Sequence, residues 1–147
     1  MSKGHKIKPH HEGAYMNAAR GFAALSKAVR LQVGAVAELR GAIIAEGFNG
    51  QPPGEDNCCE DVNDDGTLST KSSTRHAELN LVLSLARGTQ SADGCTVYLT
   101  HAPCVPCAHL LKDVGVYEVV YENEYRDTTG LEVLRKAKVK VRKFKPT

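Results

Sequence analysis

Apolar residues along the 147-residue chain recur with two different periods, and their order predicts the elements of the fold. Two short apolar runs, residues 33–37 and 41–48, flank Glu38-Leu-Arg-Gly41 and predict a β-hairpin. A first helix is predicted over residues 14–29, where apolar side chains recur at helical spacing: Ala14, Ala18, Phe22, Leu25 and Val29.

The second half of the chain alternates between helical and strand patterns. A helix is predicted to begin near His76 and to end at Gly88, with Ser72, Ser73 or Thr74 as its N-cap. Its apolar stripe would be Leu79, Val82, Leu83 and Ala86. Strands are predicted at 95–100, 116–121 and 139–144, and helices at 105–114 and 131–136. This alternation predicts a three-layer α/β/α domain with a mostly parallel sheet.

Length and composition describe an ordinary globular chain. A chain of 147 residues with 41% hydrophobic and 24% charged residues suits one domain over 1–147, with residues 1–12 expected to form a loose, flexible arm. Residues 49–74 are rich in Gly, Pro, Asp, Asn and Ser and predict a long loop, a kind of segment that is often functional. No apolar run predicts a membrane helix or secretion signal, and five cysteines fit a reducing compartment, so we expect a cytoplasmic protein.

The net charge of +2 is small, but the charges are unevenly distributed. An acidic group lies between residues 55 and 65, and a basic group between 135 and 145 consists of Arg135, Lys136, Lys138, Lys140, Arg142, Lys143 and Lys145. The basic group could contact phosphates. We favour the alternative that it forms the solvated face of an edge strand, where lysines oppose aggregation.

The sequence His76-Ala-Glu78, followed by Pro103-Cys104-Val105-Pro106-Cys107, carries the strongest chemical information in the chain. One imidazole and two thiolates supply three of the four ligands of a tetrahedral zinc ion and leave one position for water. A nearby carboxylate can move the protons of such a water, and His-x-Glu with Pro-Cys-x-x-Cys is the pattern of zinc nucleobase deaminases.

Two simpler interpretations of these residues stay open. Cys104 and Cys107 could form a redox pair at a helix N-terminus, although that leaves His76 and Glu78 without a role. A closed structural zinc site would need a fourth Cys or His ligand.

With these motifs placed, the chain resembles the cytidine/deoxycytidylate deaminase superfamily, and most closely the dCMP deaminases of the phage and eukaryotic kind. The similarity covers about residues 15–145 and includes several segments in family order: Gln32-Val-Gly-Ala35, Gly47-Phe-Asn-Gly50, His76-Ala-Glu-Leu-Asn80, Tyr98-Leu-Thr100 and Val116–Tyr121. The resemblance implies a three-layer fold around a five-stranded mixed sheet. A histidine at 76, where free-nucleoside deaminases usually have cysteine, favours the nucleotide and nucleic-acid branches.

The resemblance also implies roles for individual residues. His76, Cys104 and Cys107 would bind zinc, and Glu78 would carry a proton from water to N3 of cytosine and to the departing ammonia. Asn49 would hold the sugar, and Val33 and Ala77 would line the substrate pocket. Ser26-Lys27 is a candidate phosphate contact, and Tyr125-Arg126 is a candidate pair for base stacking and phosphate binding. A turn asparagine at 49 and a surface location for Tyr125-Arg126 are the alternatives.

The segment 50–59 resembles the loop that contributes to an effector site in phage dCMP deaminases, where dCTP activates and dTTP inhibits. Its candidate effector residues are Gly50, Gly54, Asn57, Cys58 and Cys59. A second zinc, held by Cys58 or Cys59 with His5, His10 or His11, or a Mg²⁺ bound with the effector, is a further possibility; free thiols are the simpler interpretation. Asp61–Leu68 copies the front of a calcium loop but has Ser72 at the twelfth position, so we predict an Asx-rich turn.

The leading functional hypothesis is therefore zinc-dependent deamination of dCMP by a homo-oligomer, a hexamer by family resemblance. Deamination of a base in tRNA or single-stranded DNA is the first alternative. It is weakened by 5% aromatic residues, the absence of Trp and the small net charge, because such enzymes need a basic, aromatic channel. A catalytically silent nucleotide sensor is the second, and the presence of Glu78 argues against it.

Overall fold

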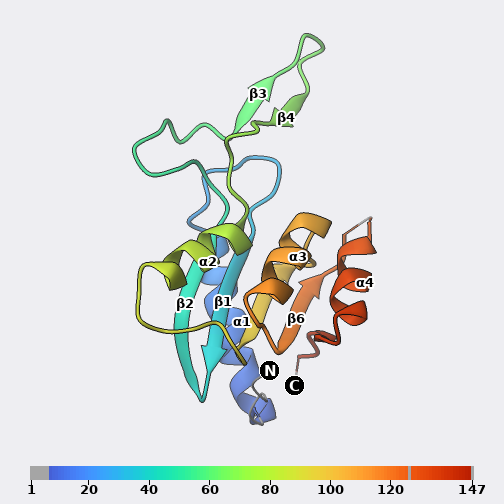
Figure 1. The fold of residues 1–147 in the computed structure, drawn as a ribbon. Helices are drawn as coiled ribbons and strands as arrows, with labels where there is room; N and C mark the ends of the chain where they lie inside the picture. Colours follow the sequence, from blue (N-terminus) through green and yellow to red (C-terminus); the bar gives the residue numbers. More distant parts are fainter. Residues whose placement is uncertain (1–6, 126, 147) are drawn as a thin grey trace.

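A computed structural model describes residues 7–125 and 127–146, and a five-stranded sheet forms its centre (Figure 1). Its helices are α1 (Pro9–Ala23), α2 (Ala77–Ala86), α3 (Val105–Asp113) and α4 (Thr129–Lys136). The sheet contains β1 (Gly34–Leu39), β2 (Ala42–Phe48), β5 (Thr96–His101), β6 (Glu118–Asn123) and β7 (Lys140–Lys143), and β3 (Glu60–Val62) and β4 (Leu68–Thr70) form a separate hairpin. None of the described helices is long and apolar enough to span a membrane.

The strand order β2-β1-β5-β6-β7 makes the sheet mixed. β5, β6 and β7 are parallel, whereas β1 pairs antiparallel with both β2 and β5. The expectation of a mixed sheet is confirmed. Four of the five strands run in the same direction, as the expectation of a mostly parallel sheet requires, and β1 alone is reversed. The predicted β1–β2 hairpin is present, and a hairpin necessarily makes an antiparallel pair.

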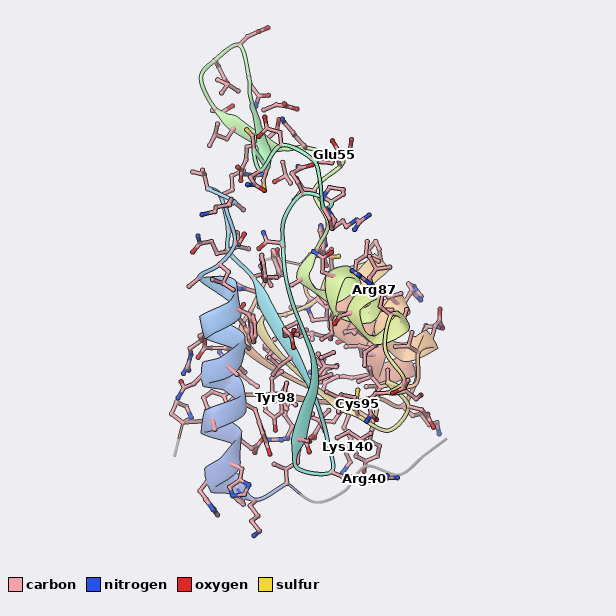
Figure 2. The ribbon with its side chains drawn as sticks, turned by 90° about the vertical axis from the view of Figure 1, so that its left-hand side faces the viewer. Arg40, Glu55, Arg87, Cys95, Tyr98 and Lys140 are labelled. Atoms are coloured by element: carbon pink, nitrogen blue, oxygen red, sulfur yellow. The ribbon has the colours of Figure 1, made fainter. Side chains whose placement is uncertain are left out.

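Helices cover both faces of the sheet, which confirms the three layers (Figure 2). Successive strand residues point to opposite faces, so Val36, Tyr98 and Val120 pack with α1, while Ala35, Val97, Leu99 and Val119 belong to the larger core under α2, α3 and α4. Both faces are apolar because β1, β5 and β6 are central strands covered on both sides.

The first helix differs from its prediction at both ends. It begins at Pro9, a residue suited to the first helical position, so residues 9–12 are helical and not a loose arm. It ends at Ala23, and Leu25 and Val29 beyond it are 54% and 75% exposed. Its buried side chains are Tyr15, Met16, Ala19 and Ala23. Packing on β1 and β5 selected this stripe over the predicted one, which had the same period.

The second helix also turns a different stripe inward. Its buried residues are Ala77, Glu78, Leu81 and Leu85, not the predicted set that began at Leu79. Because α2 is apolar on most of its circumference, periodicity could not distinguish the two faces. The predicted Ser/Thr cap is also wrong, since His76 itself occupies the N-cap position.

The long segment between β2 and α2 is not entirely loop, because it contains the β3–β4 hairpin that extends from the end of the domain (Figure 1). In its turn, the Asp65 carboxylate accepts hydrogen bonds from the backbone and hydroxyl of Thr67, and Asn63 bonds Thr67 and Ser69. The predicted Asx-rich turn is confirmed.

The basic C-terminal segment forms an edge strand, as the favoured interpretation predicts. Arg142 of β7 is bonded to Glu118 at 2.9 Å and to Glu12 of α1 at 2.7 Å, and Glu12 also accepts a hydrogen bond from the buried hydroxyl of Tyr98. These carboxylates raise the pKa of Arg142 above its ordinary value. The network joins the edge strand to α1.

Candidate active site

Three potential metal ligands meet where α2 and α3 begin. Nδ1 of His76 lies 3.4 Å from Sγ of Cys104 and 3.3 Å from Sγ of Cys107. All three ligand atoms lie within 4.8 Å of one another. Zinc–nitrogen and zinc–sulfur bonds at a tetrahedral angle separate such atoms by about 3.6 Å. The donor set and its spacing therefore fit one zinc ion with a fourth position left over.

The local sequence explains why the ligands converge. His76 and Cys104 are the extended N-cap residues of α2 and α3, and Pro106 suits the first turn of α3. Close backbone contacts hold both helix starts, because a Cβ at Gly47 would overlap the carbonyl oxygen of Ala77, and one at Gly130 would overlap that of Pro103. These glycines bring β2 and α4 against the residues next to the ligands.

The thiols show the electrostatics of a metal-ligand pair. The hydrogen bond from Cys107, opposed by burial and supported by His76, lowers the pKa of Cys104 to about 4. Sharing its proton with that thiolate raises the pKa of Cys107, and the thiolate also raises the pKa of His76. Cys104 at the N-cap and Cys107 in the first turn of α3 also lie where the helix dipole favours negative charge.

Glu78 is the carboxylate of this site, and it is only 4% exposed. Burial raises its pKa to about 7, with a further contribution from the charge of Cys104. A carboxyl group with this pKa can both accept and release a proton near neutral pH.

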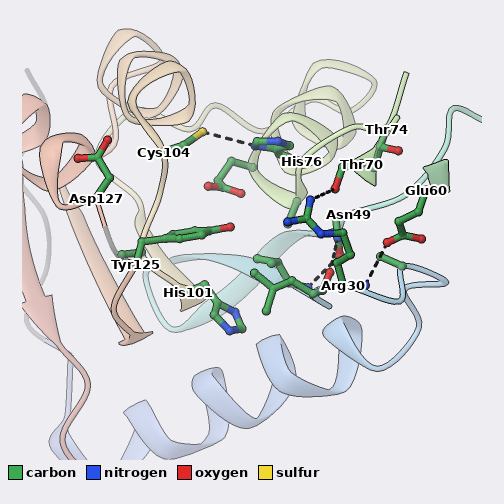
Figure 3. Close-up of a pocket in the computed structure, with 16 residues that line it drawn as sticks. Arg30, Asn49, Glu60, Thr70, Thr74, His76, His101, Cys104, Tyr125 and Asp127 are labelled. Carbon is green, nitrogen blue, oxygen red and sulfur yellow. Dashed lines mark hydrogen bonds between the residues drawn. The ribbon is translucent and has the colours of Figure 1, made fainter. Parts of the chain in front are cut away.

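His76, Cys104 and Glu78 line a cavity of about 710 Å³, a size common for small-molecule sites (Figure 3). Its lining comes from several parts of the chain: Ala28, Arg30, Leu31, Val33, Asn49, Glu60, Thr70, Thr74, His76, Ala77, Glu78, His101, Ala102, Cys104, Tyr125 and Asp127. Residues as distant in sequence as Ala28 and Asp127 thus share one pocket.

Of the sequence-predicted substrate residues, Asn49, Val33, Ala77 and Tyr125 line the cavity. The Asn49 side chain accepts from the Val33 N–H at 2.8 Å and donates to the Leu31 carbonyl at 2.7 Å. Asn49 therefore shapes the pocket wall besides facing the cavity.

Two other predicted residues lie elsewhere. Ser26 is buried in the segment between α1 and β1, where its hydroxyl donates to the Asn49 carbonyl and accepts from the Ala28 N–H. Lys27 is exposed and is not among the residues that line the cavity. Arg126, predicted as the partner of Tyr125, lies outside the described residues.

Tyr125 stands at the mouth of the cavity and is 41% exposed. Its ring lies 6.4 Å from that of His101 between centroids. Burial, together with the negative charges of Glu78 and the thiols, raises the pKa of Tyr125, and the charge of Arg30 opposes them. Charged groups on both sides of the cavity therefore affect the pKa of Tyr125.

The predicted effector residues lie beside this cavity and not inside it. The backbone of Gly50 pairs with that of Arg75, next to His76, and the Thr74 hydroxyl donates to the carbonyl of Cys59. Gly54 adopts a left-handed turn, and the Asn57 carbonyl accepts from the thiol of Cys59. Cys58 is exposed and Cys59 is buried.

The group of His76, Cys104 and Cys107 is the one potential metal cluster in the described part of the chain.

The sequence did not identify Arg30, Glu60, Thr70, Thr74 or Asp127 as cavity residues. Arg30 lies only a few residues after Ser26-Lys27, the predicted phosphate contact. Its positive charge near that pair is the feature of the sequence that could have identified it. Nothing in the pattern showed that the β3–β4 hairpin returns to the cavity.

Comparisons with known proteins agree with this geometry. Residues 9–123 match the family model described as the cytidine and deoxycytidylate deaminase zinc-binding region. The chain therefore belongs to this deaminase family.

Individual relatives are similar along most of the chain. It is 32% identical over 155 residues to deoxycytidylate deaminase of Enterobacteria phage T4, covering 79% of this chain and 80% of the relative. The deoxycytidylate deaminase of Mus musculus is 34% identical, with 82% of this chain and 72% of the relative covered. Among solved structures, dCMP deaminase from the cyanophage S-TIM5 in complex with dCMP and dUMP has a TM-score of 0.88 and 40% identity, covering 95% of this chain and 100% of that one. The expected cytidine-deaminase-like fold is thus confirmed.

Proposed function

We propose that this chain catalyses the hydrolytic deamination of dCMP to dUMP, with zinc held by His76, Cys104 and Cys107. The observation that carries the proposal is the buried carboxylate of Glu78 beside three converging metal ligands in one cavity. The likeness to a solved dCMP deaminase with dCMP and dUMP supports the substrate. Because the cavity is lined by residues from 28 to 127, we assign the activity to one domain over 1–147.

The proposed chemistry replaces the C4 amino group of cytosine with oxygen from water. When bound, zinc supplies the Lewis acidity that makes water nucleophilic at neutral pH. Glu78 takes one proton from the attacking water and delivers it to N3; it then transfers the second proton of that oxygen to the amine, which leaves as ammonia while the C4–N bond breaks and the C4 carbonyl of uracil forms. Glu78 can perform these transfers because its raised pKa keeps both protonation states accessible.

Pocket residues would orient the nucleotide for this reaction. We propose that Tyr125 stacks on the base or sugar and that Asn49 holds the sugar, with Val33 and Ala77 as apolar walls. Ser26 supports the wall through Asn49. Lys27 and Arg126 stay predictions as outer phosphate contacts.

We further propose that the loop carrying Gly50, Gly54, Asn57, Cys58 and Cys59 binds triphosphate effectors, with dCTP as activator and dTTP as inhibitor. The contacts Gly50–Arg75 and Cys59–Thr74 support this role, because they join the loop to the segment immediately before His76. A dose series of both triphosphates that leaves dCMP turnover flat would rule it out.

A second metal and an oligomeric state complete the proposal. A second zinc at Cys58 or Cys59, or Mg²⁺ bound with the effector, would need ligands beyond those that the described residues bring together. Light scattering giving a hexamer is the expected result for the oligomer. Metal analysis giving two zinc ions per chain would support the second site, whereas one ion per chain would support the simpler interpretation of free thiols at Cys58 and Cys59. The proposed compartment is the cytoplasm, that of the host if the chain is phage-encoded, where free nucleotides occur.

Ultraviolet detection of cytosine-to-uracil conversion tests the proposed function. The substrates are dCMP, CMP, deoxycytidine, 5-methyl-dCMP and a single-stranded oligonucleotide, each with and without dCTP. Turnover of dCMP supports the proposal. Turnover of the oligonucleotide alone would assign the chain to nucleic-acid editing, and zinc-loaded protein that binds dCMP without converting it would be a sensor.

A further inference from the structure

A pair of rings lines one side of the cavity, one ring from the sheet and one from a connecting segment. His101 ends β5, and Tyr125 lies between β6 and α4. Their ring centroids are 6.4 Å apart and their planes are inclined by 55°, within the range of aromatic pairs that attract each other. Figure 3 shows the two rings as neighbours, with Tyr125 extending toward the middle of the cavity. His101 thus lies against a side chain that the nucleotide would contact.

Backbone contacts on both sides of His101 fix the end of β5. His101 pairs with Asn123 in the parallel register of β5 and β6. The Asn123 side chain donates to the carbonyl of Thr100 at 2.8 Å, and its backbone carbonyl accepts from the Ala102 N–H at 2.8 Å. The residue before His101 and the residue after it are therefore both bonded to β6, which leaves the backbone of His101 little freedom.

The hydroxyl of Thr100 fixes the orientation of the His101 ring. Oγ1 of Thr100 accepts from the Gly34 N–H at 3.0 Å and lies 2.9 Å from Nδ1 of His101. Thr100 is 3% exposed, and Nδ1 is the acceptor that the described residues offer to its hydroxyl hydrogen. Thr100 therefore donates, Nδ1 accepts, and the hydrogen of the neutral imidazole is on Nε2. Burial lowers the pKa of His101, so this neutral form is present near neutral pH.

Tyr125 has less support of its own. It lies outside the strands and helices and is 41% exposed, and within the described part of the chain its hydroxyl has no hydrogen-bond partner. An exposed side chain changes rotamer rapidly, and a ligand that needs one rotamer loses affinity in ordering it. The contact with His101 reduces that loss, because it restricts the ring of Tyr125 before a ligand binds.

We propose that His101 is a positioning residue, which holds the ring of Tyr125 in the orientation that stacks on the base of the nucleotide. Thr100, in turn, holds the ring of His101. This inference rests on the proposed function, in which Tyr125 contacts the nucleotide. Preorganisation increases affinity without adding a contact to the ligand, so His101 contributes to binding through Tyr125. The effect of replacing His101 must therefore disappear when Tyr125 is absent.

A double-mutant cycle on product affinity tests this dependence. Calorimetry would measure the dissociation constant of dUMP for the zinc-loaded wild type, His101→Leu, Tyr125→Leu and the double variant. We expect His101→Leu to weaken dUMP binding roughly 3- to 10-fold, as for the loss of one aromatic contact, and Tyr125→Leu to weaken it more. In the Tyr125→Leu background, His101→Leu should change the dissociation constant by less than about 2-fold.

Further variants separate the ring contact from a general loss of structure. His101→Phe keeps a ring against Tyr125 and should recover part of the affinity that His101→Leu loses. Thr100→Val removes the hydroxyl bond and should weaken dUMP binding when His101 is present but not in His101→Leu. His109→Leu is the matched control, because it makes the same replacement at an exposed position of α3 that does not line the cavity, and it should leave dUMP affinity unchanged. His101→Gln replaces His101→Leu in the cycle if the leucine variant does not fold.

Two results would overturn the role of His101. One is an equal loss of dUMP affinity on replacing His101 with and without Tyr125, which would mean that His101 contacts the ligand directly or only supports the fold. The other is unchanged dUMP affinity in His101→Leu. Wild-type turnover of dCMP, measured on the same preparation, separates a failure of this inference from a failure of the proposed function.

Discussion

Gly47 lies directly against the carbonyl oxygen of Ala77, with no room for a Cβ between β2 and α2. Because Ala77 stands between His76 and Glu78, this contact sets the position of a metal ligand and of the proton carrier together. A sheet glycine that does not itself line the cavity thus contributes to the geometry of the site.

Replacing Gly47 by alanine should push α2 away from the sheet. We expect a loss of roughly 1–3 kcal/mol in unfolding free energy, as for overpacked cores, and weaker zinc retention. Urea unfolding and zinc content after dialysis measure both effects. Gly13→Ala is the control, because nothing lies within 4 Å of a Cβ there and alanine favours a helix, so this variant should be as stable as the wild type or more so. Equal behaviour of the two variants would refute the close-contact argument.

Replacing Glu78 by glutamine should separate metal binding from catalysis. The amide keeps the size of the side chain but cannot carry the proton, so we expect dCMP turnover to fall by roughly 10²- to 10⁴-fold while zinc content stays at the wild-type level. Steady-state rates on zinc-quantified protein check this. Near-normal turnover would rule out Glu78 as the proton carrier.

Serine at Cys107 should abolish tight zinc binding, because the thiolate is lost while its volume is nearly kept. We expect chelation to lower the melting temperature of the wild type but not that of Cys107→Ser, since ligand stabilisation requires an intact site. Cys95→Ala is the matched control. Its thiol is buried in the core, away from the ligands, where burial raises its pKa to about 12, and this variant should still bind zinc. Equal zinc content in both variants would contradict the ligand assignment.

His101 should make the fold sensitive to acid. Burial lowers its pKa below the ordinary value of about 6.5, so the unfolded chain binds the proton more tightly than the folded chain. Its contribution to stability is therefore present above pH 6.5 and declines as the pH falls below it. Unfolding free energies measured between pH 7.5 and 5 should fall less in His101→Gln than in the wild type. Identical slopes for the two proteins would show that His101 does not account for the effect.

Much of the fold could be predicted from the sequence, because strong local patterns determine it. Glu38–Gly41 between two apolar runs predicted the β1–β2 hairpin, and the helix predicted over 105–114 is α3, Val105–Asp113. Helix faces were harder to predict. Tyr15 and Met16 are buried where Phe22 and Leu25 were expected, because two stripes of equal period competed and only packing on the sheet decided between them.

The candidate site likewise contains residues that the sequence predicted and residues that it did not. His76, Glu78, Cys104 and Cys107 were found because a metal centre requires particular residue types at particular spacings. Glu60 was missed because it reaches the cavity through the return of the β3–β4 hairpin, a tertiary arrangement that leaves no periodic signal, and the contact of Arg30 with Thr70 of that hairpin is equally invisible in the sequence. Asn49 was found by resemblance, whereas its bonds to Leu31 and Val33 became visible only in the structure.

A zinc titration with dCMP tests the central claim most directly. Metal-free protein is reconstituted with increasing zinc, and the rate of dUMP formation is measured at each step beside Glu78→Gln. We predict that the rate rises in proportion to zinc up to one ion per chain at the His76–Cys104–Cys107 group, and that the variant binds the same zinc with almost no turnover. Turnover without zinc, or no dUMP at full occupancy, would contradict the account.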